Sequence, residues 1–188
     1  SNLEREFLVK ASRIKGLNAA DGQFRAVDAT AGFGEDSLLL AAAGYNVELY
    51  EYDPVIAALL RDALRRAAQS SDDALRDAVS RMDLREGDSV SAMRAMAGSD
   101  ESPDIVLLDP MFPERRKSAL VKKKFQLLQQ LESPCKGADE SELLGAAEAA
   151  GPRRIIIKRP LKGPYLAGRR PGYSITGKAV RYDCIVIP

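Results

Sequence analysis

Three short segments of this chain carry residues whose types and spacing could do chemistry. Asp28 precedes the turn Gly32-Phe33-Gly34, Glu51 follows later, and Asp109 opens the segment Asp109-Pro110-Met111-Phe112-Pro113. Each acid ends a short apolar run that is typical of a β-strand. Ligands of parallel sheets bind beyond the carboxyl ends of the strands, so these acids and this turn are candidates for one binding site.

The glycine turn differs from the fingerprint of dinucleotide-binding proteins. That fingerprint requires a third Gly or Ala where this chain has Ser37. Gly32 and Gly34 still permit positive φ and a close approach of a ligand to the backbone. An acid followed by Gly-x-Gly is instead similar to the loop of S-adenosylmethionine-dependent methyltransferases, whose cofactor brings an amino group and a sulfonium to the acid. The alternative is a tight structural turn.

Two further positions could contact the same cofactor. Glu51 can accept two hydrogen bonds from a ribose diol, as the acid does in nucleotide-binding folds. Its alternative is a surface acid or a helix-capping charge. Asp88 and Ser89 follow a weakly marked third strand, where they could meet the adenine ring.

The segment from Asp109 to Pro113 resembles the Asp/Asn-Pro-Pro-Tyr/Phe motif of methyltransferases that modify exocyclic amino groups of nucleobases. An aromatic amine is a poor nucleophile because its lone pair is delocalised into the ring. A carboxylate at Asp109 and a backbone carbonyl could accept its two N–H bonds, while Pro110 fixes the turn and Phe112 offers a flat face for stacking. The alternative is a proline-rich turn after a core strand.

The composition excludes several other chemistries. The chain has no histidine, which excludes Ser-His and Cys-His nucleophile pairs, histidine metal sites and histidine general bases. Cys135 and Cys184 lack metal spacing and a CxxC partner, so we expect free thiols in a reducing cytoplasm and no metal. No apolar run approaches the ~20 residues of a membrane span, and no signal-peptide pattern opens the chain, so we expect no membrane partner.

Charge is balanced overall but not locally. The net charge is +1, yet residues 115–124 and 153–182 contain no acid and hold more than half of the 28 basic residues. Such asymmetry is expected of a protein that binds a polyanion. The alternative is a solvated surface with scattered counter-charges.

The elements that must position these residues alternate between helices and strands. Helices are predicted at Leu3–Ile14, at Asp36–Ala43, from the Asp53-Pro54 start, at Ala74–Val79, at Ser118–Leu131 and at Ser141–Ala150. Strands are predicted at Phe24–Asp28, Asn46–Glu51, Met82–Arg85, 104–109 and Ile155–Ile157, with a closing hairpin of Tyr173–Thr176 and Val180–Ile187. This order predicts an α/β fold of the Rossmann-like class I methyltransferase type, with a mostly parallel sheet and a C-terminal antiparallel hairpin. We expect a single domain over residues 1–188, with residues 1–20 as helix and linker.

Several segments together closely resemble the bacterial ribosomal RNA small subunit methyltransferase J family. They are 27–32, 54–60, 109–113, the run Lys-Ser-Ala-Leu-Val-Lys-Lys at 117–123, and 157–160. The similarity covers nearly the whole chain from Glu4 onward. It implies that S-adenosylmethionine is used to methylate N2 of a guanosine in 16S ribosomal RNA. The implied partner is that RNA or the small ribosomal subunit, in the cytoplasm.

The resemblance also implies roles for residues by position. The implied catalytic residues are Asp109, Pro110 and Phe112, and the implied cofactor contacts are Asp28, Thr30, Gly32, Gly34, Glu35, Asp36, Glu51, Tyr52, Asp88, Ser89 and Asp109. This chain departs from the family at Glu35 and Tyr52, where the family has Arg, and at Asp88, where it has Ser. Family members also carry an N-terminal segment before the first helix, which we expect to be absent here.

The basic stretches are expected to flank the target and to bind RNA phosphates, which position a substrate without choosing the base. The residues concerned are Arg115, Arg116, Lys117, Lys122, Lys123, Lys158 and Arg159. For Lys122, Lys123 and Lys124 the alternative is the solvent face of an amphipathic helix. Two other functions remain open: amino-group methylation of DNA or protein, and a non-catalytic RNA-binding assembly factor that retains the fold.

Overall fold

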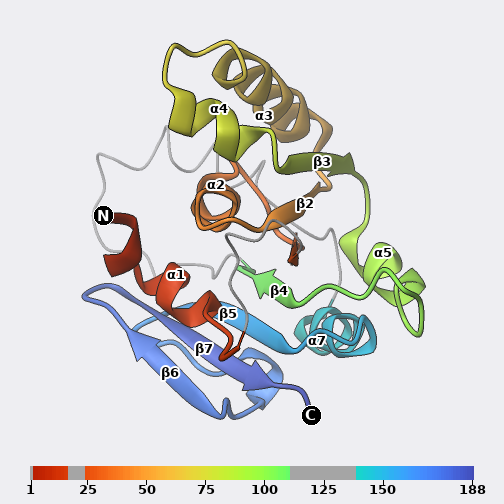
Figure 1. Ribbon diagram of the computed structural model, residues 1–188. Coiled ribbons are helices and arrows are strands. Elements are labelled where there is room, and N and C mark those ends of the chain that lie inside the picture. The colour runs from red at the N-terminus through yellow and green to blue at the C-terminus, as the bar shows by residue number, and fades with distance from the viewer. Residues whose placement is uncertain (1, 17–23, 111–138) are drawn as a thin grey trace, which may run out of the picture.

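The computed structural model describes residues 2–16, 24–110 and 139–188 (Figure 1). The described strands form one sheet in the order β3-β2-β1-β4-β5-β7-β6. Their bounds are β1 Arg25–Asp28, β2 Asn46–Glu51, β3 Met82–Glu86, β4 Ile105–Leu108, β5 Arg154–Pro160, β6 Tyr173–Thr176 and β7 Val180–Val186. Strands β1 to β5 are parallel to one another, and β7 runs antiparallel to β5 and to β6. The predicted mixed sheet with its C-terminal hairpin is confirmed.

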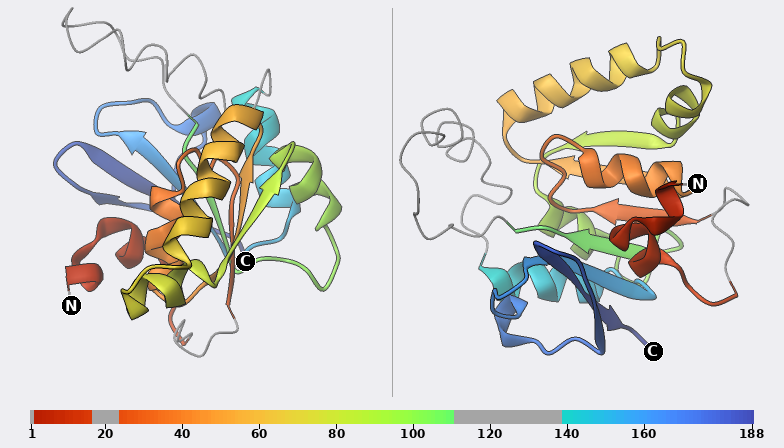
Figure 2. Two further views of the ribbon diagram at one scale, coloured as in Figure 1. Left: turned by 90° about the horizontal axis from the view of Figure 1, so that it is seen from above. Right: turned by 90° about the vertical axis from the view of Figure 1, so that its left-hand side faces the viewer.

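Helices cover both faces of this sheet (Figures 1 and 2). Their bounds are η1 Asn2–Arg5, α1 Phe7–Ser12, α2 Glu35–Ala42, α3 Pro54–Ala67, α4 Asp73–Val79, α5 Ser89–Ala95, α7 Glu140–Ala149 and η3 Leu166–Gly168. Helices α1 and α2 contribute to one hydrophobic cluster, and α5 and α7 contribute to a second one. The helix predicted at Ser118–Leu131 lies outside the described residues. No helix in the described ranges is long and apolar enough to cross a membrane.

Strand β4 joins the two halves of the core. Ile105 and Leu107 belong to the cluster on the α1 and α2 side, whereas Val106 and Leu108 belong to the cluster on the α5 and α7 side. All four side chains are fully buried. Burial of one such side chain contributes roughly 1.5–3 kcal/mol, so this run strongly favours a central strand and fixes where Asp109 emerges.

Local signals set several helix starts. Asp53 caps α3 as predicted, because its carboxylate accepts hydrogen bonds from the backbone N–H groups of Val55 and Ile56. Asp88 caps α5 in the same way. Helix α5 is absent from the sequence-based prediction, which placed only a possible ligand contact at Asp88.

The first predicted helix is shorter than its apolar spacing indicates. The segment Leu3–Ile14 divides at Glu6, whose backbone is extended, and α1 ends at Ser12. A distant side chain terminates it: Nη1 of Arg154, on β5, donates to the carbonyls of Ala11 and Arg13 at 2.6 and 2.7 Å. The guanidinium of Arg154 also lies 5.6 Å from the ring centroid of Tyr173. Arg154 therefore fastens α1 to the sheet.

Replacement of Arg154 by Met should lower the free energy of unfolding by about 2–3 kcal/mol, since two charge-assisted hydrogen bonds to helix-terminal carbonyls disappear. Chemical denaturation measures this change. The matched control is Arg153→Met, because Arg153 is exposed and its Nε lies 3.3 Å from Oδ1 of Asp104 in a surface ion pair worth less than about 1 kcal/mol. Equal effects of the two substitutions would contradict the role of Arg154.

Candidate active site

The loop after β1 is built around the buried carboxylate of Asp28. Its Oδ1 accepts a hydrogen bond from the Thr30 N–H at 3.1 Å, and its Oδ2 accepts one from the Ser37 hydroxyl at 2.6 Å. Asp28 is 2% exposed. Burial raises the pKa of Asp28 to about 7, although both hydrogen bonds act in the opposite direction. Ser37, at the position of the missing third glycine, thus has a function that the sequence comparison did not identify.

The two glycines of this loop have different surroundings. Both have positive φ, 53° at Gly32 and 76° at Gly34. A Cβ on Gly34 would lie 2.9 Å from Cδ1 of Leu60 on α3, whereas a Cβ on Gly32 would have no atom within 4 Å. Gly34 thus combines a positive φ with a close approach to Leu60, and Gly32 leaves open space beside the backbone. That space is where a ligand could approach the loop.

Glu51 links this loop to the start of α3. Its Oε2 accepts a hydrogen bond from the Gly32 N–H at 2.9 Å, and its Oε1 accepts one from the Asp53 N–H at 2.8 Å. Glu51 is 2% exposed, which excludes the surface-acid alternative, and burial raises its pKa. The next residue, Tyr52, is exposed and follows β2 at the same edge.

Asp109 lies between the glycine loop and β5. Its backbone N–H donates to Oγ1 of Thr30 at 2.6 Å. Nζ of Lys158 lies 2.6 Å from Oδ2 of Asp36 and 3.4 Å from Oδ2 of Asp109. Burial raises the pKa of Asp109, and the nearby ammonium opposes that rise. The structure therefore brings Asp36 and Asp109 together at Lys158, and Asp28 lies within electrostatic reach of both carboxylates.

The remaining predicted cofactor contacts lie around this group. Glu35 and Asp36 form the first turn of α2, and Glu35 is exposed. Asp88 uses its carboxylate to cap α5, which lowers its pKa through hydrogen bonds from Ser91 and from the backbone. Ser89 is buried. The Gly87 N–H donates to the Glu51 carbonyl, so the Asp88 segment lies beside the end of β2.

The two predicted RNA contacts on β5 do not lie on an open basic surface. The Lys158 side chain is 26% exposed and points at two carboxylates. Arg159 is 1% exposed, donates from Nε to the Pro164 carbonyl at 2.9 Å, and lies 3.4 Å from Oε1 of Glu140. The other predicted residues lie outside the described ranges: Phe112, Arg115, Arg116, Lys117, Lys122 and Lys123.

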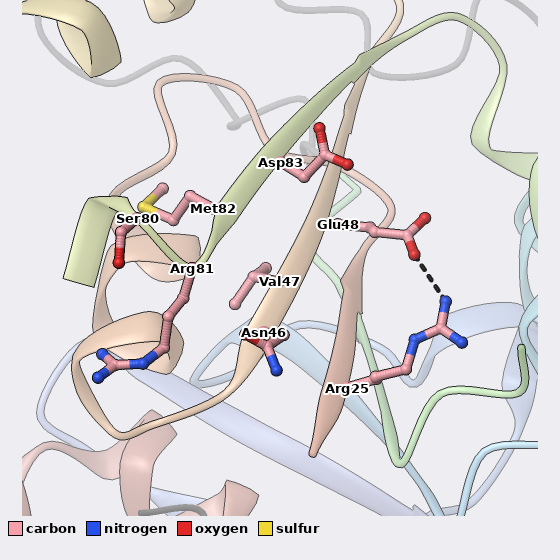
Figure 3. A pocket seen from close by; sticks show the side chains of 8 residues that line it. All are labelled: Arg25, Asn46, Val47, Glu48, Ser80, Arg81, Met82 and Asp83. Atoms are coloured by element: carbon pink, nitrogen blue, oxygen red, sulfur yellow. Dashed lines mark hydrogen bonds and ion pairs between the residues drawn. The ribbon is translucent and has the colours of Figure 1, made fainter. Parts of the chain in front are cut away.

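A separate hollow of about 240 Å³ opens at the amino ends of β1, β2 and β3 (Figure 3). Its lining includes the ion pair between Nη2 of Arg25 and Oε1 of Glu48, at 2.7 Å. None of the predicted site residues lines it. Among the described residues, no group of three or more His, Cys, Asp or Glu side chains is arranged to hold a metal ion.

The buried state of Asp28 predicts a pH-dependent stability. Its pKa is raised in the folded chain from an ordinary value of 3.8, so the folded state binds more protons between that value and about pH 7. The contribution of protonated Asp28 to the free energy of unfolding is fully present below pH 4. It is lost as the pH rises through 7, and the loss is roughly 4 kcal/mol at most. Asp28→Asn removes the titration. The variant should therefore gain stability relative to the wild type between pH 4 and pH 8, as measured by urea denaturation, and a constant difference would contradict the assignment.

The known proteins that this chain resembles agree with the site described above. Residues 2–187 match a family described as "Putative SAM-dependent methyltransferase". A relative from Pseudomonas aeruginosa (strain UCBPP-PA14), named ribosomal RNA small subunit methyltransferase J, is 48% identical over 85% of this chain and 59% of its own length. The protein of that name from Neisseria gonorrhoeae is 42% identical over 83% of this chain and 61% of its own length. The chain thus spans about three fifths of these curated relatives, which confirm the expected resemblance.

Solved structures agree on the fold. The crystal structure of a SAM-dependent methyltransferase from Neisseria gonorrhoeae has a TM-score of 0.72 at 32% identity, over 96% of this chain and 70% of that chain. The rRNA methyltransferase aviRa from Streptomyces viridochromogenes has a TM-score of 0.59 at 16% identity, over 98% of this chain and 83% of that chain, and shares the fold alone. The match over nearly every residue and the arrangement of the acids lead to one conclusion: this chain belongs to the SAM-dependent methyltransferase family.

Proposed function

We propose that this chain carries the catalytic domain of an enzyme that methylates the exocyclic N2 of a guanosine in 16S ribosomal RNA, with S-adenosylmethionine as the donor. The observation that carries the proposal is the partly buried Asp109, which emerges from β4 directly beside the Asp28 loop. The names of the relatives from Pseudomonas aeruginosa and Neisseria gonorrhoeae support a ribosomal RNA substrate. Such a substrate implies a cytoplasmic location.

The residues present fit the cofactor. The carboxyl groups of Asp28, Asp36 and Asp109 outnumber the ammonium of Lys158, so this group favours a ligand with positive charge and would repel a pyrophosphate. We assign the amino-acid end of the cofactor to the Asp28 loop, including Thr30, Gly32 and Gly34, and to the first turn of α2, where Glu35 and Asp36 lie. The ribose is assigned to Glu51 and the adenine to Tyr52, Asp88 and Ser89. Both Glu51 oxygens hold a backbone N–H and retain a second lone pair for a ribose hydroxyl.

When bound, S-adenosylmethionine supplies a methyl group on an already activated sulfonium, which explains how the chain manages without histidine. The chain has to position the amine. Lys158 approaches Oδ2 of Asp109, and the proposal assigns an N–H of the guanine amine to Oδ1. Pro110 directs the chain after Asp109 and donates no hydrogen bond, and Phe112 is proposed to stack on the base. As the N–C bond forms and the C–S bond breaks, the amine proton can pass to Asp109.

Two described lysines lie where RNA would enter. Lys162 follows the carboxyl end of β5, and Lys178 lies in the turn between β6 and β7, whose first residue, Val180, pairs with Pro160. Both lysines are exposed. We propose that they hold phosphates at the rim, together with Arg115, Arg116, Lys117, Lys122 and Lys123. The target guanosine has to be unstacked, since its N2 is otherwise out of reach.

Transfer of radiolabelled methyl groups tests the function. We expect the wild-type chain to label naked 16S RNA, the small subunit or the ribosome, and nucleoside analysis to identify N2-methylguanosine. Asp109→Ala should reduce the rate at least about 100-fold, because the amine loses its acceptor, while RNA affinity is retained. Asp100→Asn is the matched control, since Asp100 is exposed. Label on DNA, on protein or on another nucleoside would contradict the proposal, and RNA binding without transfer would favour an assembly factor.

The proposed basic rim predicts a steep salt dependence of RNA affinity. Each phosphate contact adds about 0.7–0.9 to the slope of log K against log salt, so the double variant Lys162→Ala, Lys178→Ala should lower that slope by roughly 1.5. Fluorescence anisotropy with a labelled RNA fragment measures it. The control is the pair Lys15→Ala, Arg153→Ala, because both residues are exposed and Arg153 precedes β5 at the opposite edge. An RNA affinity of the wild type that does not change with salt concentration would contradict the proposed basic rim.

A further inference from the structure

Lys158 was expected to bind an RNA phosphate, but its ammonium contacts two carboxylates in the structure. Strands β4 and β5 pair in parallel with Leu108 opposite Ile157, so Asp109, just after β4, lies beside Lys158 within β5. The ammonium of Lys158 lies 2.6 Å from Oδ2 of Asp36 and 3.4 Å from Oδ2 of Asp109. One side chain thus joins β4, β5 and the first turn of α2.

The surroundings of this ammonium are strongly acidic. Asp36 on α2 and Asp109 after β4 contribute carboxylates, and Tyr182 on β7 faces the same group. Asp28 on β1 is under the electrostatic influence of both carboxylates. Glu6, which precedes α1, acts on Tyr182, and Arg159 on β5 adds a weaker positive influence on Asp109. Neighbouring carboxylates in a buried site cannot all remain ionised without a nearby cation. Lys158 supplies that cation in direct contact with two of them.

We propose that Lys158 is a positioning residue for methyl transfer, whose ammonium holds Asp109 ionised and correctly oriented by pairing it with Asp36. This inference rests on the proposed function, because it assigns the amine to Asp109. It differs from the sequence-based expectation, in which Lys158 binds an RNA phosphate. In the folded chain the ammonium is already engaged by carboxylates, and it acts on the substrate only through Asp109.

The pH profile of kcat/KM separates this role from a merely structural one. In Lys158→Met, Asp109 loses its partner and remains protonated to higher pH, so the acidic limb of the profile should move upward by one to two pH units. The rate at pH 7 should fall by about 10-fold to 100-fold, and the deficit should shrink toward pH 9. Lys158→Arg keeps the charge and should retain the wild-type profile. Lys15→Met is the control for loss of an exposed lysine, since Lys15 has no proposed role in binding or transfer.

Two outcomes of that experiment would overturn the proposal. A loss of rate that is the same at every pH would indicate a structural effect of Lys158. A loss of RNA affinity and of salt slope in Lys158→Met, with an unchanged pH profile, would instead assign the ammonium to an RNA phosphate. The expected RNA affinity of Lys158→Met is within twofold of the wild type.

A second measurement does not depend on activity. Carbon-13 NMR follows the titration of carboxyl groups, and Asp109→Asn identifies the signal of Asp109. The midpoint of Asp109 should rise in Lys158→Met and fall in Asp36→Asn, because removal of the competing carboxylate leaves the ammonium to Asp109 alone. If either variant folds and the titration midpoint of Asp109 is unchanged in it, the pairing of Asp109 with Asp36 through Lys158 is refuted. If the midpoints shift as expected but the wild type transfers no methyl group, the proposed function is refuted and the pairing of Lys158 with the two carboxylates still stands.

Discussion

Burial of carboxylates at one edge of the sheet is the constraint on which the rest of the site depends. Asp28 and Glu51 are almost inaccessible, and Asp109 and Asp36 are largely covered. Removal of an ionised carboxylate from water costs several kcal/mol unless hydrogen bonds or an opposite charge replace the lost hydration. The N–H groups of Thr30, Gly32 and Asp53 replace it here, as do the Ser37 hydroxyl and the Lys158 ammonium. The acids therefore determine the conformation of the loops around them.

The order of the strands explains why these groups meet. Asp28, Asp109 and Lys158 are far apart in the chain, yet they follow or occupy β1, β4 and β5, which are adjacent in the sheet. Because the three strands are parallel, their carboxyl ends lie at the same edge. Strand β4 is packed on both faces, since its side chains belong to both hydrophobic clusters. A well-packed scaffold thus supports a polar site whose own hydrogen bonds are few and specific.

The charge distribution divides the site into an acidic floor and a basic rim. The floor is formed by Asp28, Asp36 and Asp109, and the exposed Lys162 and Lys178 lie at the rim. Under the proposed function the floor would attract a cationic cofactor and the rim would attract the phosphate backbone. This division would admit a single unstacked base to the floor while the rest of the RNA stays outside. Local separation of charge would then let a chain of net charge +1 serve both ligands.

The sequence by itself determined whatever depends on near neighbours along the chain. Alternating apolar runs predicted β2 and the closing hairpin, and Asp53 with Pro54 marked the start of α3, because caps and side-chain periodicity act over a few residues. The acids and glycines of the site were also identified there, since strand ends are visible as the ends of apolar runs.

Only the tertiary structure decided what depends on distant partners. Arg154 ends α1 from the other end of the chain, and Lys158 and Arg159 are engaged by acids of α2, of α7 and after β4. A lysine in an acid-free stretch of sequence predicts a solvated positive charge, because nothing nearby in the chain neutralises it. Folding supplies the counter-charges from remote segments, so Lys158 pairs with Asp36 and Asp109, and Arg159 pairs with Glu140.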